Sequence, residues 1–170
     1  VQLGGGNDSE RRAYYIIGSI FKDNTGLGLY TGYSRIAEVH DNQFTGNGSG
    51  LTIRNNGGIG HITNNLIMQN KGYGLVAGGY SAHAVVERNV IADNQGIGVS
   101  LGGFGGSVHL IDNRIINNHD GAIHTSPSGN AVQDMILTSN VIEGNTINRS
   151  CSNYYYGCQD SIIEVKGNFA

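Results

Sequence analysis

The sequence predicts an all-β fold, a parallel β-helix solenoid of about seven coils, and two observations predict it. An asparagine recurs every 23 to 28 residues, and a second asparagine follows it five residues later. Between the second asparagine of one repeat and the first asparagine of the next lie runs in which apolar and polar residues alternate. A short period repeated this often is typical of a solenoid, whose units bury their apolar sides only against their neighbours. Alternation with a period of two residues indicates strands.

The asparagines define the coils, most clearly in residues 86–99, VERNVIADNQGIGV. The first asparagine position is occupied by Asn42, Asn65, Asn89, Asn113, Asn140 and Asn168, with Ser19 one period earlier. The second is occupied by Asn24, Asn47, Asn70, Asn94, Asn118 and Asn145. Asparagine tolerates left-handed turns, and stacked amides can hydrogen-bond from coil to coil. We therefore interpret both series as structural.

Each coil contains two alternating runs whose inward positions are aliphatic at nearly every level. In the first run these positions are Tyr14/Ile16, Ala37/Val39, Gly60/Ile62, Ala84/Val86, Val108/Leu110, Met135/Leu137 and Ile163/Val165. In the second they are Leu29/Thr31, Leu51/Ile53, Leu75/Ala77, Val99/Leu101 and Ile123/Thr125. Such stacking predicts strands paired in parallel between successive coils about 4.8 Å apart.

The repeat divides the chain into a short N-terminal segment and one domain. Residues 1–12 carry no repeat and are a linker, a frayed terminus or part of an incomplete first coil, whereas residues 13–170 form the β-helix. The regular coils are 13–34, 35–57, 58–81, 82–105 and 106–130, and residues 146–160 are an inserted loop. We expect the chain to be part of a longer one.

In this repeat the chain resembles the right-handed parallel β-helix proteins, the pectate-lyase-like superfamily with PbH1 repeats. Its units are most similar to those of alginate epimerases and periplasmic copper-maturation proteins, down to strings such as TGNGSGLTIRN. The resemblance implies a right-handed coil over about residues 13–170. The epimerases carry an Asp-Pro-His motif after the Gly-aliphatic pair, whereas this chain reads GLYTGY, GLTIRN, GLVAGG, GVSLGG and GAIHTSP there. The fold hosts many functions, so function depends on the site.

Composition excludes several classes of partner. The net charge is −3, and the ten basic residues are scattered singly, so nucleic acid is not expected to bind. No apolar run reaches the roughly 18 residues of a membrane span. No cofactor motif is present, because the GGG near the N-terminus lacks the lysine of a phosphate-binding loop.

The inserted loop contains both cysteines and a run of three tyrosines. Cys151 and Cys158 have no metal-binding spacing, so they form a local disulfide or remain two free thiols. A six-residue gap permits the bond if the Cα atoms approach within about 7 Å, and we expect it to form. Tyr154, Tyr155 and Tyr156 then either cover an open apolar edge or bind a sugar face or a protein partner.

Three N-x-S/T sequons are candidate N-glycosylation sites. They lie at Asn7, Asn47 and Asn148, although a sequence rich in asparagine produces some by chance. Together with the paired cysteines they favour an extracellular or cell-surface location.

The outward positions of the second run supply candidate binding residues. They read Tyr30, Thr52, Val76, Ser100 and His124, and Arg54 lies two positions after Thr52. Glycoside hydrolysis requires a pair of carboxylates, and a calcium-dependent lyase requires acidic calcium ligands and a base. This row contains no carboxylate. We therefore assign Tyr30, Arg54 and His124 to binding rather than catalysis.

The outward positions of the first run are more polar. The strand spacing places Glu38 one strand, about 4.8 Å, from His61 and roughly 7 Å from His40. Two histidines and one carboxylate can bind a divalent metal with coordination positions left open. The alternative is a solvated polar face with one Glu–His pair, which contributes under about 1 kcal/mol.

Two functions remain open. The first is a non-catalytic segment that acts as a rigid scaffold and recognition surface in adhesion or assembly. Its partner would be a protein or a polysaccharide, with end-to-end packing against flanking coils or other subunits. The second is a polysaccharide lyase, epimerase or hydrolase acting on a polyuronide, or a fragment of one. The missing carboxylates, the short corners, the sequons and the cysteine-tyrosine loop favour the first.

Overall fold

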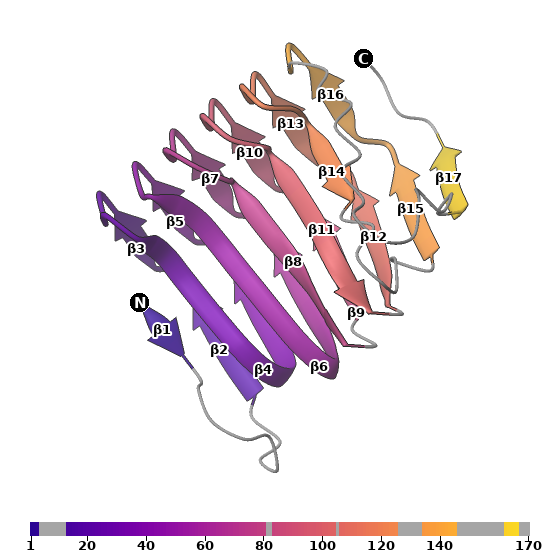
Figure 1. Ribbon diagram of the computed structural model, residues 1–170, viewed down its shortest axis with the longest axis horizontal. Helices are drawn as coiled ribbons and strands as arrows, with labels where there is room; N and C mark the ends of the chain where they lie inside the picture. The colour runs from indigo at the N-terminus through magenta and orange to yellow at the C-terminus, as the bar shows by residue number, and fades with distance from the viewer. Residues whose placement is uncertain (4–12, 81–82, 105, 126–133, 146–161, 167–170) are drawn as a thin grey trace, which may run out of the picture.

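The computed structural model of the chain is an all-β solenoid in which every described strand pair is parallel. It describes residues 1–3, 13–80, 83–104, 106–125, 134–145 and 162–166. Figure 1 shows successive coils lying side by side along the molecule. The predicted fold is therefore confirmed. The described residues contain no helix long and apolar enough to cross a membrane.

Three faces surround the core. The first face contains β2 (Ala13–Ile17), the second halves of β4 (Leu27–His40) and β6 (Ser49–Thr63), β9 (His83–Glu87), β12 (Ser107–Ile111), β15 (Asp134–Thr138) and β17 (Ile162–Lys166). The second face contains β1 (Gln2–Leu3), the first halves of β4 and β6, β8 (Leu75–Tyr80), β11 (Val99–Phe104) and β14 (Ile123–Thr125). The short-strand face contains β3 (Ile20–Lys22), β5 (Gln43–Thr45), β7 (Leu66–Met68), β10 (Val90–Ala92), β13 (Arg114–Ile116) and β16 (Val141–Glu143).

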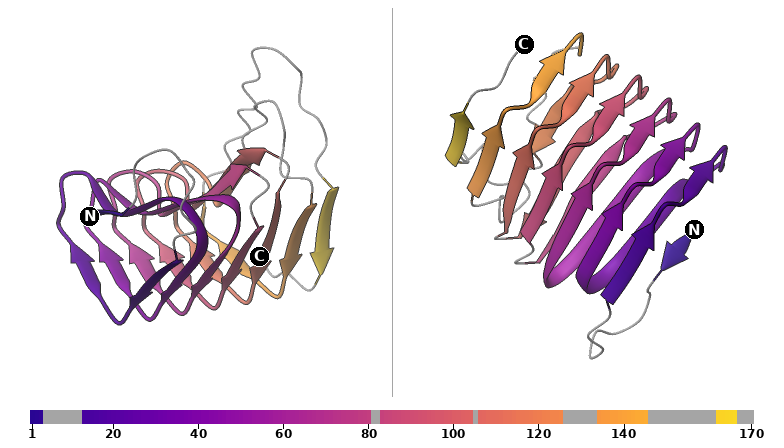
Figure 2. Two further views of the ribbon diagram at one scale, coloured as in Figure 1. Left: turned by 90° about the horizontal axis from the view of Figure 1, so that it is seen from below. Right: turned by 180° about the vertical axis from the view of Figure 1, so that it is seen from behind.

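The first and second faces are two parts of one sheet, because β4 and β6 run through the corner between them. β6 pairs with β8 on the second face and with β9 on the first. The β4–β6 pairing shifts register on both sides of Ser34, where β4 turns. The six short strands form a separate sheet. Figure 2 shows the coils from two further sides.

The number of coils differs from the expected seven or so. Only the coils at 13–34, 35–57, 58–81, 82–105 and 106–130 have a described strand on all three faces. A sixth coil contributes β15 and β16, and β17 begins another on the first face. The described part of the chain therefore makes about five complete turns. At the other end, β1 pairs with β4 and adds one strand to the second face, as part of an incomplete first coil would.

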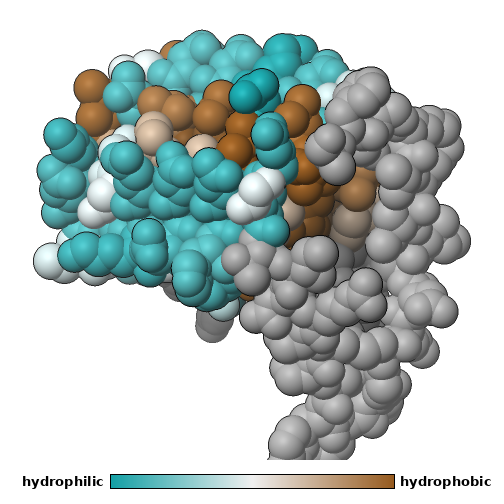
Figure 3. Space-filling view, turned by 90° about the horizontal axis from the view of Figure 1, so that it is seen from above, coloured by the Kyte–Doolittle hydropathy of each residue, from teal (hydrophilic) through white to brown (hydrophobic). Residues whose placement is uncertain are grey.

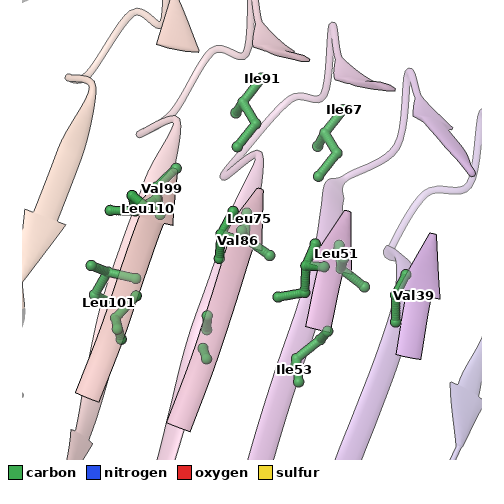
Figure 4. Packing of buried hydrophobic residues seen from close by; sticks show 14 of the residues in the cluster. Val39, Leu51, Ile53, Ile67, Leu75, Val86, Ile91, Val99, Leu101 and Leu110 are labelled. Atoms are coloured by element: carbon green, nitrogen blue, oxygen red, sulfur yellow. The ribbon is translucent and has the colours of Figure 1, made fainter. Parts of the chain in front are cut away.

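The core is a stack of aliphatic rows, as the alternating runs predict. Leu51, Leu75, Val99 and Ile123 are paired in register across four coils. Leu51, Leu75 and Val99 are fully buried, and Ile123 packs against the same cluster. Figure 4 shows Leu51, Leu75 and Val99 pointing inward from successive strands. The predicted row is thus confirmed as buried at Leu51, Leu75 and Val99, whereas Ile123 is only partly buried.

Two asparagine ladders line the corners at either end of the short strands. Asn89 shows the pattern: its Oδ1 accepts the backbone N–H of Asn65 at 2.9 Å and the Asn65 amide at 3.0 Å. Its own amide donates to the Ile62 carbonyl at 2.7 Å and to Asn113 Oδ1 at 3.0 Å. Asn94 repeats this arrangement in the second ladder. The predicted bonding from coil to coil is confirmed.

The left-handed turns are not made by the ladder asparagines themselves, so that part of the prediction is wrong. The residue with positive φ is the one before each of them. The non-glycine examples are Asp23, Asp41, Asn64, Gln69, Arg88, Asp93, Asp112, Asn117 and Ser139, with φ between 52° and 60°. A left-handed residue costs roughly 1–2 kcal/mol. Six of the nine are Asp or Asn, which tolerate this conformation best. Gln69, Arg88 and Ser139 have no such preference, which indicates that the ladder that follows imposes the turn at these three positions.

Gly74, at the corner between the short-strand face and the second face, lies close against the next coil. A Cβ added to Gly74 would lie 2.7 Å from the Gly98 carbonyl oxygen and 2.8 Å from the Asn94 amide nitrogen. We expect Gly74→Ala to lower the free energy of unfolding by about 1–3 kcal/mol, as overpacking does. Chemical denaturation measures this effect. Gly26→Ala is the matched control, because a Cβ there would meet nothing within 4 Å. Equal losses in both variants would contradict the explanation.

Candidate functional site

The second face displays three of the predicted binding residues, Tyr30, Arg54 and His124, as a dispersed row. Tyr30 pairs with Thr52, and the register continues through Val76 and Ser100 to His124. Tyr30 and His124 are thus four strand spacings, about 19 Å, apart. Arg54 lies between Gly32 and Gly78 of the neighbouring strands, and it is exposed. The structure places these side chains on one face and does not bring them together.

A pocket opens beside Tyr30 at the N-terminal end. Its volume is about 590 Å³, and Val1, Gln2, Tyr30 and residues 24–27 line it. The Tyr30 ring lies over Gly32, since a Cβ on that glycine would be 2.8 Å from the ring. Tyr30 is therefore positioned between the pocket and the flat outer surface of the second face.

The first face contains the predicted Glu38–His61 pair. Glu38 and His61 are partners in the β4–β6 register, and His61 Nδ1 lies 2.8 Å from Glu38 Oε1. His40 instead contacts Asp41, with 2.8 Å between Nδ1 and Oδ2. The described residues contain no group of three His, Cys, Asp or Glu side chains that could hold a metal ion. The three proposed metal ligands, Glu38, His40 and His61, are thus brought together only in part.

Exposed apolar side chains lie beside the Glu38–His61 pair, and sequence reasoning missed them. They are Tyr15, Ile17, Ile36 and Ile59, with exposures of 65%, 52%, 42% and 45%. All four lie on β2, β4 or β6, at outward positions of the first face. Carrying the strand register to the outward positions would have found them. We call these four residues together with Glu38 and His61 the first-face patch.

The outward positions of the short-strand face are also apolar in the middle coils. Figure 3 shows a hydrophobic band with hydrophilic residues on both sides. On this sheet Leu66 pairs with Val90, and Met68 pairs with Ala92. These side chains are half-buried or buried. The band is therefore less accessible than the first-face patch.

One histidine contact was not predicted. His83 Nδ1 lies 2.7 Å from Ser107 Oγ, at the start of the first-face strands β9 and β12. A serine nucleophile would need this histidine to be oriented by a third group. Among the described contacts, no carboxylate reaches His83. We interpret the pair as a surface hydrogen bond.

The candidate glycosylation site at Asn47 is contradicted by its position. Asn47 is fully buried, and its amide donates to the Phe21 carbonyl and to Asn70 Oδ1. A glycan on that nitrogen would break the ladder. Asn7 and Asn148 lie outside the described residues. The same holds for Cys151, Cys158 and the tyrosines Tyr154, Tyr155 and Tyr156.

Comparison with known families finds a match over most of the chain. The family described as "Right handed beta helix region" matches residues 2–135. No curated protein and no solved structure matches the chain. The closer resemblance to alginate epimerases and copper-maturation proteins therefore stays a prediction.

Proposed function

The chain belongs to the right-handed β-helix family, and we propose that it is a non-catalytic segment of an extracellular or cell-surface protein. In this proposal the β-helix is a rigid scaffold and presents a recognition surface to a protein or polysaccharide partner in adhesion or assembly. The sequons outside the ladder and the cysteine pair support the location.

The main observation behind the proposal is that inward residues hold the solenoid together, whereas outward residues are displayed on its surface. Inward positions form an aliphatic core and two asparagine ladders, which leave little freedom for the coils to move. Outward, Tyr30, Arg54 and His124 are spread over about 19 Å of a single face. A dispersed row on a rigid surface suits an extended partner rather than a small substrate held at one point.

End-to-end packing is part of the same proposal. β3 is the last described strand of the short-strand sheet at its N-terminal end, and its inward Phe21 is only partly buried. Asn24 donates to Asn47 Oδ1, whereas no described contact reaches the Asn24 Oδ1 atom. An edge with unfilled strand and ladder positions is a template for a further coil. Such a coil would come from a flanking segment or another subunit.

The proposal is tested with a panel of uronic-acid and neutral polysaccharides and extracellular matrix proteins. We expect binding to some members without unsaturated products, new reducing ends or epimerisation. Arg54→Ala should weaken that binding about tenfold, as the loss of an important interface residue does. Arg114→Ala is the matched control, because Arg114 is exposed on the short-strand face.

Catalytic turnover would overturn the proposal in favour of a polysaccharide-active enzyme. The pocket of about 590 Å³ beside Tyr30 is the observation that favours this alternative. Turnover that is lost in Arg54→Ala or His124→Ala would place a catalytic site on the second face.

A further inference from the structure

We infer that the first-face patch binds the same patch on a second copy of this chain, forming a weak two-fold symmetric dimer. This inference rests on the proposed scaffold function, for which it names one partner. Of the eight large apolar side chains that are exposed among the described residues, four belong to the patch. A contiguous group of exposed apolar side chains is typical of an interaction surface.

The charges of the patch favour a copy of itself as the partner. Glu38 and His61 lie side by side on adjacent strands, 2.8 Å apart, so the patch contains one acid and one base. No excess of either charge is present to attract a polyanion or a polycation. An identical surface turned by a two-fold axis can present His61 of one copy to Glu38 of the other at the centre of the overlap, which is the complementarity that an interface requires.

The register selects one orientation of that axis. If the axis runs along the strands midway between β4 and β6, each β4 faces the partner's β6. Glu38 then faces His61 of the other copy, and Ile36 faces Ile59. Tyr15 faces Val85, because β2 and β9 are each one strand further from the axis.

A two-fold axis perpendicular to the strands is disfavoured. With the axis along the solenoid, each strand would face its own copy. Glu38 would then oppose Glu38 and His61 would oppose His61, and opposition of like groups costs free energy. The dimer therefore has antiparallel solenoids that overlap through β2, β4, β6 and β9.

The overlap sets the expected strength. Four strands about 4.8 Å apart and five residues long cover roughly 19 Å by 17 Å, or about 320 Å² on each copy. Twice this area is well below the roughly 1,200 Å² of a stable interface. The dimer should therefore be weak, and it should be seen only at high protein concentration.

The test is sedimentation equilibrium of the full chain at concentrations up to the order of 1 mM. We expect a reversible monomer–dimer equilibrium whose dissociation constant rises at least about tenfold in His61→Glu, which brings four carboxylates together. The double variant Glu38→His with His61→Glu should restore association, because each acid again faces a base. Far-UV circular dichroism checks that each variant is folded.

His109→Glu is the matched control. His109 lies in the same outward column as His61, two strands further along and outside the overlap. Its change should leave the dissociation constant within about twofold. A wild-type chain that stays monomeric, or a dimer that His61→Glu does not weaken, overturns the inference. So does equal weakening by His109→Glu, or a monomer whose patch binds a polysaccharide instead. None of these results changes the outcome expected for Arg54→Ala on the second face, so the two proposals fail separately.

Discussion

Replacing Leu75 with alanine is expected to lower the free energy of unfolding by about 2–5 kcal/mol, as large-to-small core substitutions do. Leu75 is fully buried between Leu51 and Val99, its partners on the two neighbouring strands. Those neighbours are held by their own strand pairing, so they cannot collapse into the space left by the missing atoms. Chemical denaturation followed by far-UV circular dichroism measures the loss.

The control is the next residue along the same strand. Val76 points outward on the second face and is half-buried. Val76→Ala removes apolar atoms at the same level of the solenoid without opening an internal cavity, so its cost should stay under about 1 kcal/mol. If the two variants lost equal stability, the assignment of inward and outward positions would be wrong.

Replacing Asn89 with alanine should destabilise the chain by a similar amount, about 2–5 kcal/mol, for a different reason. The substitution removes the acceptor of the buried Asn65 N–H and one donor to the Ile62 carbonyl. Each buried polar group left without a partner costs about 1–3 kcal/mol. The turn before it, where Arg88 has a φ of 53°, also loses the ladder that holds it.

The comparison here is with Gln95, which is exposed in the same coil. Gln95→Ala should change the free energy of unfolding by no more than about 0.5 kcal/mol. Thermal unfolding distinguishes the two variants. An Asn89→Ala variant that melts with the wild-type chain would show that water replaces the ladder without cost.

Much of the fold follows from the sequence, because the solenoid repeats the same physical requirement in each coil. Alternation fixed which residues of the runs point inward, and Leu75 and Val99 are buried as predicted. The positive φ angles at some corners could not be predicted from the sequence. Arg88 and Gln69 have no intrinsic preference for positive φ, and they adopt it only because the next residue must enter the ladder.

The candidate site was predicted only where it depends on strand register. Register placed Glu38 beside His61, and that contact exists. His40 was expected within reach of the same metal ion, yet it contacts Asp41. The strand spacing does not determine which rotamer the His40 side chain adopts. The sequon at Asn47 was a motif match in a position that the ladder requires for itself, since the residue is buried.

The ladders also give the molecule a constant spacing from coil to coil. Each coil joins the next through the same set of amide bonds, so successive coils are about 4.8 Å apart. The distance between two residues at equivalent positions of their coils therefore depends only on how many coils separate them. Duplicating a whole unit, such as the 24 residues from Asn65 to Arg88, moves everything beyond it one coil spacing along the solenoid. Insertion of a single residue within a strand instead turns the remaining side chains of that strand to the opposite side. The solenoid can therefore lengthen by whole coils while the outward residues of each face keep their spacing.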